Sequence, residues 1–208
     1  MKRTISVSGS GRASTVPDVA DVRLGVVVTR RTVAEARTAA AETATSILAA
    51  LNALDVKRAD VRTASLIVQP EYDYKDGVQQ LRGQSVNHQY LVTVRDLEKL
   101  GRVIDDGLAA GATTLDGVSF RTADPGPANA AARVAAFQDA RGRADALANE
   151  ADVVLGPVVS IAETDRVAGP RPFAMGKVGL MAADAAPTPI EAGENEVVVG
   201  LTVVFSIT

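Results

Sequence analysis

Residues 197–207 read VVVGLTVVFSI, the most regular strand pattern in the chain. Apolar side chains recur at every second position from Val197 to Ile207, so one face of this strand is continuously apolar. We expect a strand this regular at the end of a chain to be paired inside a sheet. The strands and helices that surround it must come from the residues before it.

Shorter alternating segments precede this strand. Residues 5–8 alternate apolar side chains with serines and are expected to form a strand that stops at residues 9–11, which read GSG. Residues 22–28 are expected to form a second strand adjacent to the first. Further strands are predicted at 118–120 and 158–161.

A long hairpin is predicted in the middle of the chain. Residues 61–72 and 84–95 have strand patterns, and Asp76-Gly77 between them is typical of a turn region. One face of the second strand carries Val86, His88, Tyr90, Val92 and Val94.

Two helices begin at recognisable caps. Thr32 stands three residues before Glu35, the spacing at which each side chain can accept a hydrogen bond from the other residue's backbone N–H. The spacing of the apolar residues that follow predicts a helix over 33–54. Asp96 caps a shorter helix that ends near Gly111.

A third helix is predicted from the cap Asp124-Pro125 to about residue 151. Its buried stripe is expected to consist of Val134, Phe137, Ala144 and Leu147.

The resulting order is β-β-α-β-β-α-β-α-β-β. Because hairpins dominate, the predicted fold class is α+β, with a largely antiparallel sheet packed on one face by long helices. The length favours a single domain over 1–208. A Pro/Ala-rich loop or arm at about 165–193 is expected to be its least globular part.

Composition excludes several classes of function. The chain has no cysteine, which rules out thiol, disulfide, zinc-ribbon and iron–sulfur chemistry. Its 22 basic and 25 acidic residues give a net charge of −3, so no basic surface for nucleic acid or anionic lipid is expected. We therefore expect no nucleic-acid partner.

The N-terminal residues and the lengths of the apolar runs indicate the cellular compartment. No apolar run reaches the roughly 18 residues of a membrane span. The first residues lead straight into the strand pattern, without the apolar core of a signal peptide. We therefore expect a cytoplasmic protein, with an envelope location as the alternative if a leader has been removed.

Several ordered motifs together resemble the SIMPL-domain family over residues 4–208. They are ISVSGSG at 5–11, PEYDY at 70–74, TVRDL at 93–97, LGPV at 155–158 and PTPIE at 187–191. The resemblance implies a bacterial protein that forms oligomers, has no catalytic motif and is connected with oxidative stress. Many members begin with a secretion signal, and this chain departs from them there.

Five residues are candidates for interaction. His88, the one histidine, is expected to be hydrogen-bonded or at an interface, because one imidazole per chain cannot build a metal cluster unless an oligomer axis brings copies together. Tyr72 and Tyr74 share a strand face and are expected to pack against a neighbouring subunit. Met175 and Met181 lie in the loop, where we expect packing or subunit contact, although their thioethers can also be oxidised reversibly.

No catalytic, cofactor-binding or metal-binding residue is predicted. Glu71, Asp73 and Asp76 lie near the hairpin turn but do not match an EF-hand, so a solvated hairpin tip is the expected structure.

The favoured hypothesis is a non-catalytic protein whose partner is itself, with a structural, scaffolding or stress-protective role. The alternative is a binding module for a small apolar ligand or peptide at an exposed sheet edge. An enzyme ranks third, and loss of a measured turnover in a His88→Ala variant would favour it.

Overall fold

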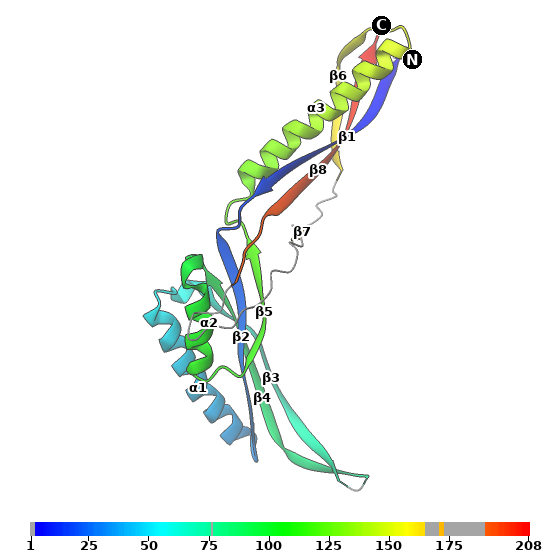
Figure 1. Cartoon of the computed structure of the whole chain (residues 1–208). Coiled ribbons are helices and arrows are strands. Elements are labelled where there is room, and N and C mark those ends of the chain that lie inside the picture. Colours follow the sequence, from blue (N-terminus) through cyan, green and yellow to red (C-terminus); the bar gives the residue numbers. More distant parts are fainter. Residues whose placement is uncertain (1–2, 76, 165–170, 173–189) are drawn as a thin grey trace, which may run out of the picture. The chain divides into compact units, whose positions relative to one another are not determined.

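The computed structural model describes residues 3–75, 77–164, 171–172 and 190–208. These residues form two compact units, each with its own sheet and its own buried core (Figure 1). The central unit comprises the described residues 18–121 and 190–191. The terminal unit comprises the described residues 3–17, 122–164, 171–172 and 192–208.

The C-terminal strand lies in the middle of the terminal unit's sheet, as predicted. β8 (Asn195–Ile207) pairs antiparallel with β1 (Thr4–Thr15) on one side and with β6 (Leu155–Thr164) on the other. The short β7 (Arg171–Pro172) also pairs with β8. Helix α3 (Gly126–Glu150) packs on this sheet against β1 and β8 (Figure 1).

Helix α3 meets the sheet mainly through alanines, and Phe137, which was expected in the buried stripe, packs partly buried against the same core. Its buried residues are Ala132, Ala136, Ala140, Ala144 and Ala148, each at most 2% exposed. Two of the side chains expected in the stripe are instead exposed, Val134 at 58% and Leu147 at 52%. The expected stripe was therefore wrong at these two positions.

Two glycines in β1 explain why the α3 residues that face this strand have small side chains. A Cβ on Gly9 would lie 2.6 Å from the amide nitrogen of Ala140, and a Cβ on Gly11 would overlap the backbone of Ala132. The helix backbone thus rests almost directly on the strand backbone. β1 continues through both glycines to Thr15, so the expectation that the strand stops there was also wrong.

The central unit has a second antiparallel sheet with the strand order β3-β4-β2-β5. Its strands are β2 (Val19–Arg30), β3 (Val61–Lys75), β4 (Val78–Val94) and β5 (Thr114–Arg121). Its helices are α1 (Val33–Ala53) and α2 (Leu100–Ala109), with short 3₁₀ segments η1 (Arg58–Asp60) and η2 (Leu97–Lys99). The core between sheet and helices includes Leu24, Ile47, Leu51, Val92 and Val103.

Local signals placed these elements well. Glu35 N–H donates to Thr32 Oγ1 over 3.2 Å and Thr32 N–H donates to Glu35 Oε2 over 3.4 Å, so the predicted capping box is confirmed. The hairpin strands run closer to the turn than predicted, since Lys75 pairs with Val78. Gly77 in this turn has φ +78°, a left-handed conformation that glycine adopts without strain.

The predicted α+β class and the antiparallel pairing are confirmed, and the element order matches loosely. The first two strands are not neighbours, because β1 and β2 belong to different sheets. The single-domain hypothesis over 1–208 stays a prediction. Most of the Pro/Ala-rich segment 165–193 lies outside the described residues.

Within the described residues, no helix combines the length and the hydrophobicity needed to cross a membrane.

Candidate functional site

His88 is held between two hydroxyl groups on the helix-covered side of the central sheet. Its Nδ1 lies 3.2 Å from the Tyr90 hydroxyl and its Nε2 lies 3.4 Å from Thr63 Oγ1. The rings of His88 and Tyr90 are 4.4 Å apart between centroids. A neutral imidazole donates through one nitrogen and accepts through the other, so both ring nitrogens are engaged. This geometry fits the hydrogen-bonded histidine expected from the sequence.

Burial favours the uncharged forms of His88 and Tyr90. It lowers the pKa of His88 below the ordinary 6.5 and raises the pKa of Tyr90 above the ordinary 10.0. Both side chains are therefore uncharged at neutral pH.

An NMR titration of the one histidine is expected to give a pKa below 6.5 for His88. Because the unfolded chain then binds a proton more readily than the folded chain, stability falls as the pH drops below about 6.5. A His88→Gln variant should lose this part of the pH dependence while keeping the rest. A measured pKa above 6.5 would contradict the burial argument.

The hairpin tyrosines lie beyond the end of β2. The last pair between β2 and β4 is Arg30 with Gln84, whereas Tyr72 and Tyr74 pair further along with Leu81 and Gln79 (Figure 1). The tyrosines are 47% and 76% exposed. The structure thus places both tyrosines on an accessible part of the hairpin, away from the His88 ring. The other two candidates, Met175 and Met181, lie outside the described residues.

Glu71 and Asp73 near the turn are engaged by their neighbours, while Asp76 lies outside the described residues. Thr29 Oγ1 donates to Glu71 Oε2 over 2.6 Å, and Arg82 lies 3.5 Å from Glu71 and 4.0 Å from Asp73. In the part of the chain that the structure describes, no group of three or more potential metal-ligating side chains is close enough to hold an ion.

One edge of the terminal sheet is blocked by side chains of α3. The backbone N–H of Ser10 donates to Asp139 Oδ2 over 2.8 Å, and the carbonyl oxygen of Ser8 accepts from Arg143 Nη1 over 3.0 Å. Asp139 and Arg143 also form an ion pair at 2.9 Å. One N–H and one carbonyl group in the middle of β1 are thus occupied, which opposes pairing of this part of the edge with another strand.

The opposite edge, β6, is open. Every residue from Pro157 to Thr164 is exposed, including the apolar Val158, Val159 and Ile161 at 39%, 52% and 54%. Among the described residues, no hydrogen bond joins the backbone of residues 158–164 to a segment other than β8. Proline has no N–H to donate, so the part of this edge suited to pairing begins after Pro157.

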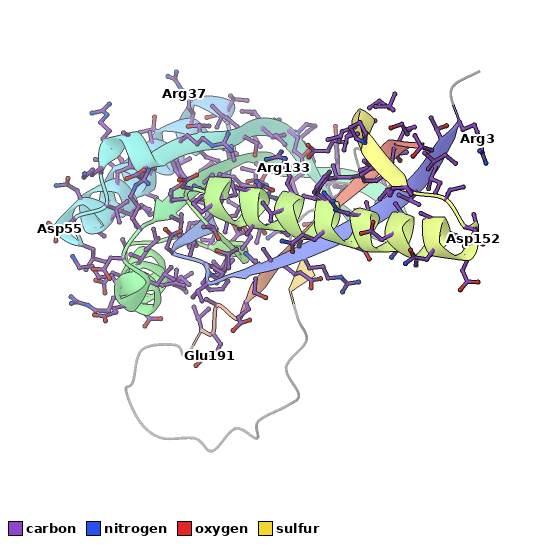
Figure 2. All side chains as sticks on the ribbon, turned by 90° about the horizontal axis from the view of Figure 1, so that it is seen from above. Arg3, Arg37, Asp55, Arg133, Asp152 and Glu191 are labelled. Atoms are coloured by element: carbon purple, nitrogen blue, oxygen red, sulfur yellow. The ribbon has the colours of Figure 1, made fainter. Side chains whose placement is uncertain are left out.

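An apolar groove of about 690 Å³ lies between α3 and β6. Its lining residues are Arg133, Val134, Phe137, Gln138, Ile161, Glu163 and Leu201. Arg133, labelled on α3 in Figure 2, bonds Glu163 of β6 over 3.0 Å, and this bond raises the pKa of Arg133. The apolar groove and the open edge together form a surface suited to an extended partner.

Sequence reasoning identified the 158–161 strand but not its position at an edge. The apolar run VVSIA at 158–162 is equally compatible with a buried strand. Strand order depends on pairings between distant segments, and no local signal in β6 reports it.

Comparisons with known proteins give a consistent result. Residues 5–205 match the family described as "SIMPL: Protein of unknown function (DUF541)". The chain is 35% identical over 211 residues to the 26 kDa periplasmic immunogenic protein of Brucella melitensis, covering 98% of this chain and 84% of that protein. It is also 35% identical over 183 residues to the uncharacterized protein YggE of Escherichia coli K12, covering 88% of this chain and 73% of YggE.

These relatives correct one expectation. A cytoplasmic location was expected from the N-terminal residues, but the relative from Brucella is named a periplasmic protein. The cytoplasmic expectation is therefore wrong, and the comparison points to the cell envelope.

Proposed function

The chain belongs to the SIMPL family of proteins of unknown function, and from this premise we propose that it is a non-catalytic envelope protein that associates with copies of itself. Its role in this proposal is structural or scaffolding, and a stress-protective role would be a consequence of the assembly. The contact is formed by the edge of β6.

The observation that supports this proposal is the difference between the two edges of the terminal sheet. Ser8 and Ser10 of β1 are blocked by α3, whereas the apolar Val159 and Ile161 of β6 are exposed at an open edge. An exposed apolar edge strand is a template for pairing with another chain. Two copies related by a two-fold axis can pair their β6 strands antiparallel, so that the same patch meets itself.

Light scattering coupled to size exclusion tests the proposal on the full chain over a range of concentrations. We expect a species well above the monomer mass of 21.5 kDa. An Ile161→Lys variant should shift this species towards the monomer, because it places a charge within the apolar contact. Circular dichroism establishes that the variant remains folded.

The matched control is Leu66→Lys. Leu66 lies in β3, an edge strand of the central unit, and is 59% exposed, so the chemical change is the same at a different edge. The control should assemble as the unchanged chain does. A strictly monomeric chain at high concentration would refute self-association, and loss of assembly only in the control would assign the contact to β3.

A second candidate function uses the same edge. The groove beside β6 and the exposed Ile161 suit an extended peptide that adds a strand to the sheet. In that case the chain would stay monomeric, and a bound peptide would be released by the Ile161→Lys change.

A further inference from the structure

A second groove, of about 570 Å³, lies in the central unit between α1 and the strands β3 and β4. Its volume is in the range of small-molecule sites. The lining residues are Thr45, Leu48, Ala49, Leu51, Asn52, Val56, Arg58, Val61, Thr63 and Tyr90. None of these residues belongs to β6, so the groove is separate from the proposed assembly contact.

The walls of this groove are largely apolar. Leu48 of α1 is 40% exposed, Leu51 and Val56 are buried, and Val61 of β3 packs partly buried against the same core. A ligand with an apolar body would cover the exposed part of Leu48. Removing this apolar surface from water makes a favourable contribution to the free energy of binding.

Arg58 is the one charged residue among the described residues that line the groove. The nearby carboxylates are engaged elsewhere, because Asp60 is held by Arg95 at 2.7 Å and Asp55 by Lys99 at 2.8 Å. Among the described residues, no ion pair of Arg58 is present. The groove thus combines apolar walls with one uncompensated positive charge.

Polar neutral groups complete the lining. Thr63 and Tyr90 present hydroxyl groups that also contact the neutral ring of His88, and Asn52 adds a side-chain amide. None of these groups carries a charge that would oppose an anion.

We propose that this groove binds an amphipathic monocarboxylate, with the carboxylate on Arg58 and the apolar body along Leu48. A guanidinium matches a carboxylate through two parallel hydrogen bonds, which favours this head group over a hydroxyl of the same size. The site requires no second subunit and does not depend on the assembly of the chain.

Isothermal titration of the full chain with decanoate, below the concentration at which decanoate forms micelles, tests this proposal. We expect saturable binding that an Arg58→Gln variant weakens roughly tenfold or more, since the charged hydrogen bonds to the carboxylate are lost. Decan-1-ol, which has the same chain without the charge, should bind the variant and the unchanged protein alike.

Arg37→Gln is the matched control. Arg37 is an exposed arginine of α1 that does not line the groove and whose side chain projects away from the ribbon (Figure 2). This variant should bind decanoate within about twofold of the unchanged protein, a difference of less than about 0.5 kcal/mol.

The NMR signal of His88 locates the ligand, because His88 contacts both Thr63 and Tyr90 of the groove. It should shift on addition of decanoate in proportion to the bound fraction. Absence of saturable binding, equal binding by Arg58→Gln, or binding that leaves the His88 signal unmoved would each overturn the proposal. Failure of self-association would leave it standing.

Discussion

A Gly11→Ala variant is expected to lose the packing of α3 on its sheet. The added Cβ would overlap the carbonyl oxygen of Ala132 and the amide nitrogen of Ala136, which are backbone atoms that no side-chain rotation can move away. Overpacking of this kind destabilises by roughly 1–3 kcal/mol where side chains can yield, and we expect the upper end of that range or more here. Chemical denaturation followed by circular dichroism measures the loss.

Gly142→Ala is the matched control for this change. Gly142 lies in α3 itself, and a Cβ there would meet nothing within 4 Å. Alanine is a better helix former than glycine, so this variant should be more stable by about 0.5–1 kcal/mol. Equal denaturation midpoints for the two variants would contradict the close contact between helix and strand.

A Leu24→Ala variant is expected to destabilise the central unit by about 2–5 kcal/mol. Leu24 is fully buried in the core between sheet and helices, so its truncation removes apolar contacts and leaves a cavity. Hydrogen exchange measured by mass spectrometry follows the loss segment by segment. Peptides from 18–121 should lose protection first.

Leu66→Ala provides the comparison for that change, because Leu66 is 59% exposed and its truncation should alter stability by less than about 0.5 kcal/mol. The same exchange data bear on the single-domain hypothesis. Loss of protection confined to 18–121 in the Leu24→Ala variant would mean that the two cores unfold separately. Simultaneous loss in α3 would mean one cooperative domain.

Much of the fold was predictable because its signals are local. The alternation over residues 197–207 identified β8 and its position inside a sheet. The reciprocal bonds of Thr32 and Glu35 fixed the start of α1, and Asp76-Gly77 marked the turn region of the hairpin. Each of these features depends on residues within a few positions of one another.

The errors arose where distant segments meet. Large apolar residues such as Val134 and Leu147 were expected to be buried, but Gly9 and Gly11 bring β1 so close to α3 that only alanine fits. More than a hundred residues separate these glycines from the alanines that they face. Periodicity within α3 contains no information about how near the strand approaches.

The candidate sites also divide into those that local sequence indicates and those that depend on contacts between distant segments. Tyr72, Tyr74 and His88 were selected from their own strands, and the structure gives their accessibility and partners. The groove with Arg58 and the open edge of β6 went unrecognised, because both are defined by neighbours from other parts of the chain.

The pairing of β1 with β8 also matters for protein engineering. Thr4 pairs with Ser206 and the N–H of Ile207 donates to the carbonyl oxygen of Arg3, so the two ends emerge side by side (Figure 1). A short linker between them would close the backbone, and new termini could then be opened at the hairpin turn beside Gly77. Such a circular permutant would retain every strand pairing of both sheets while moving an affinity tag or fluorophore to the hairpin.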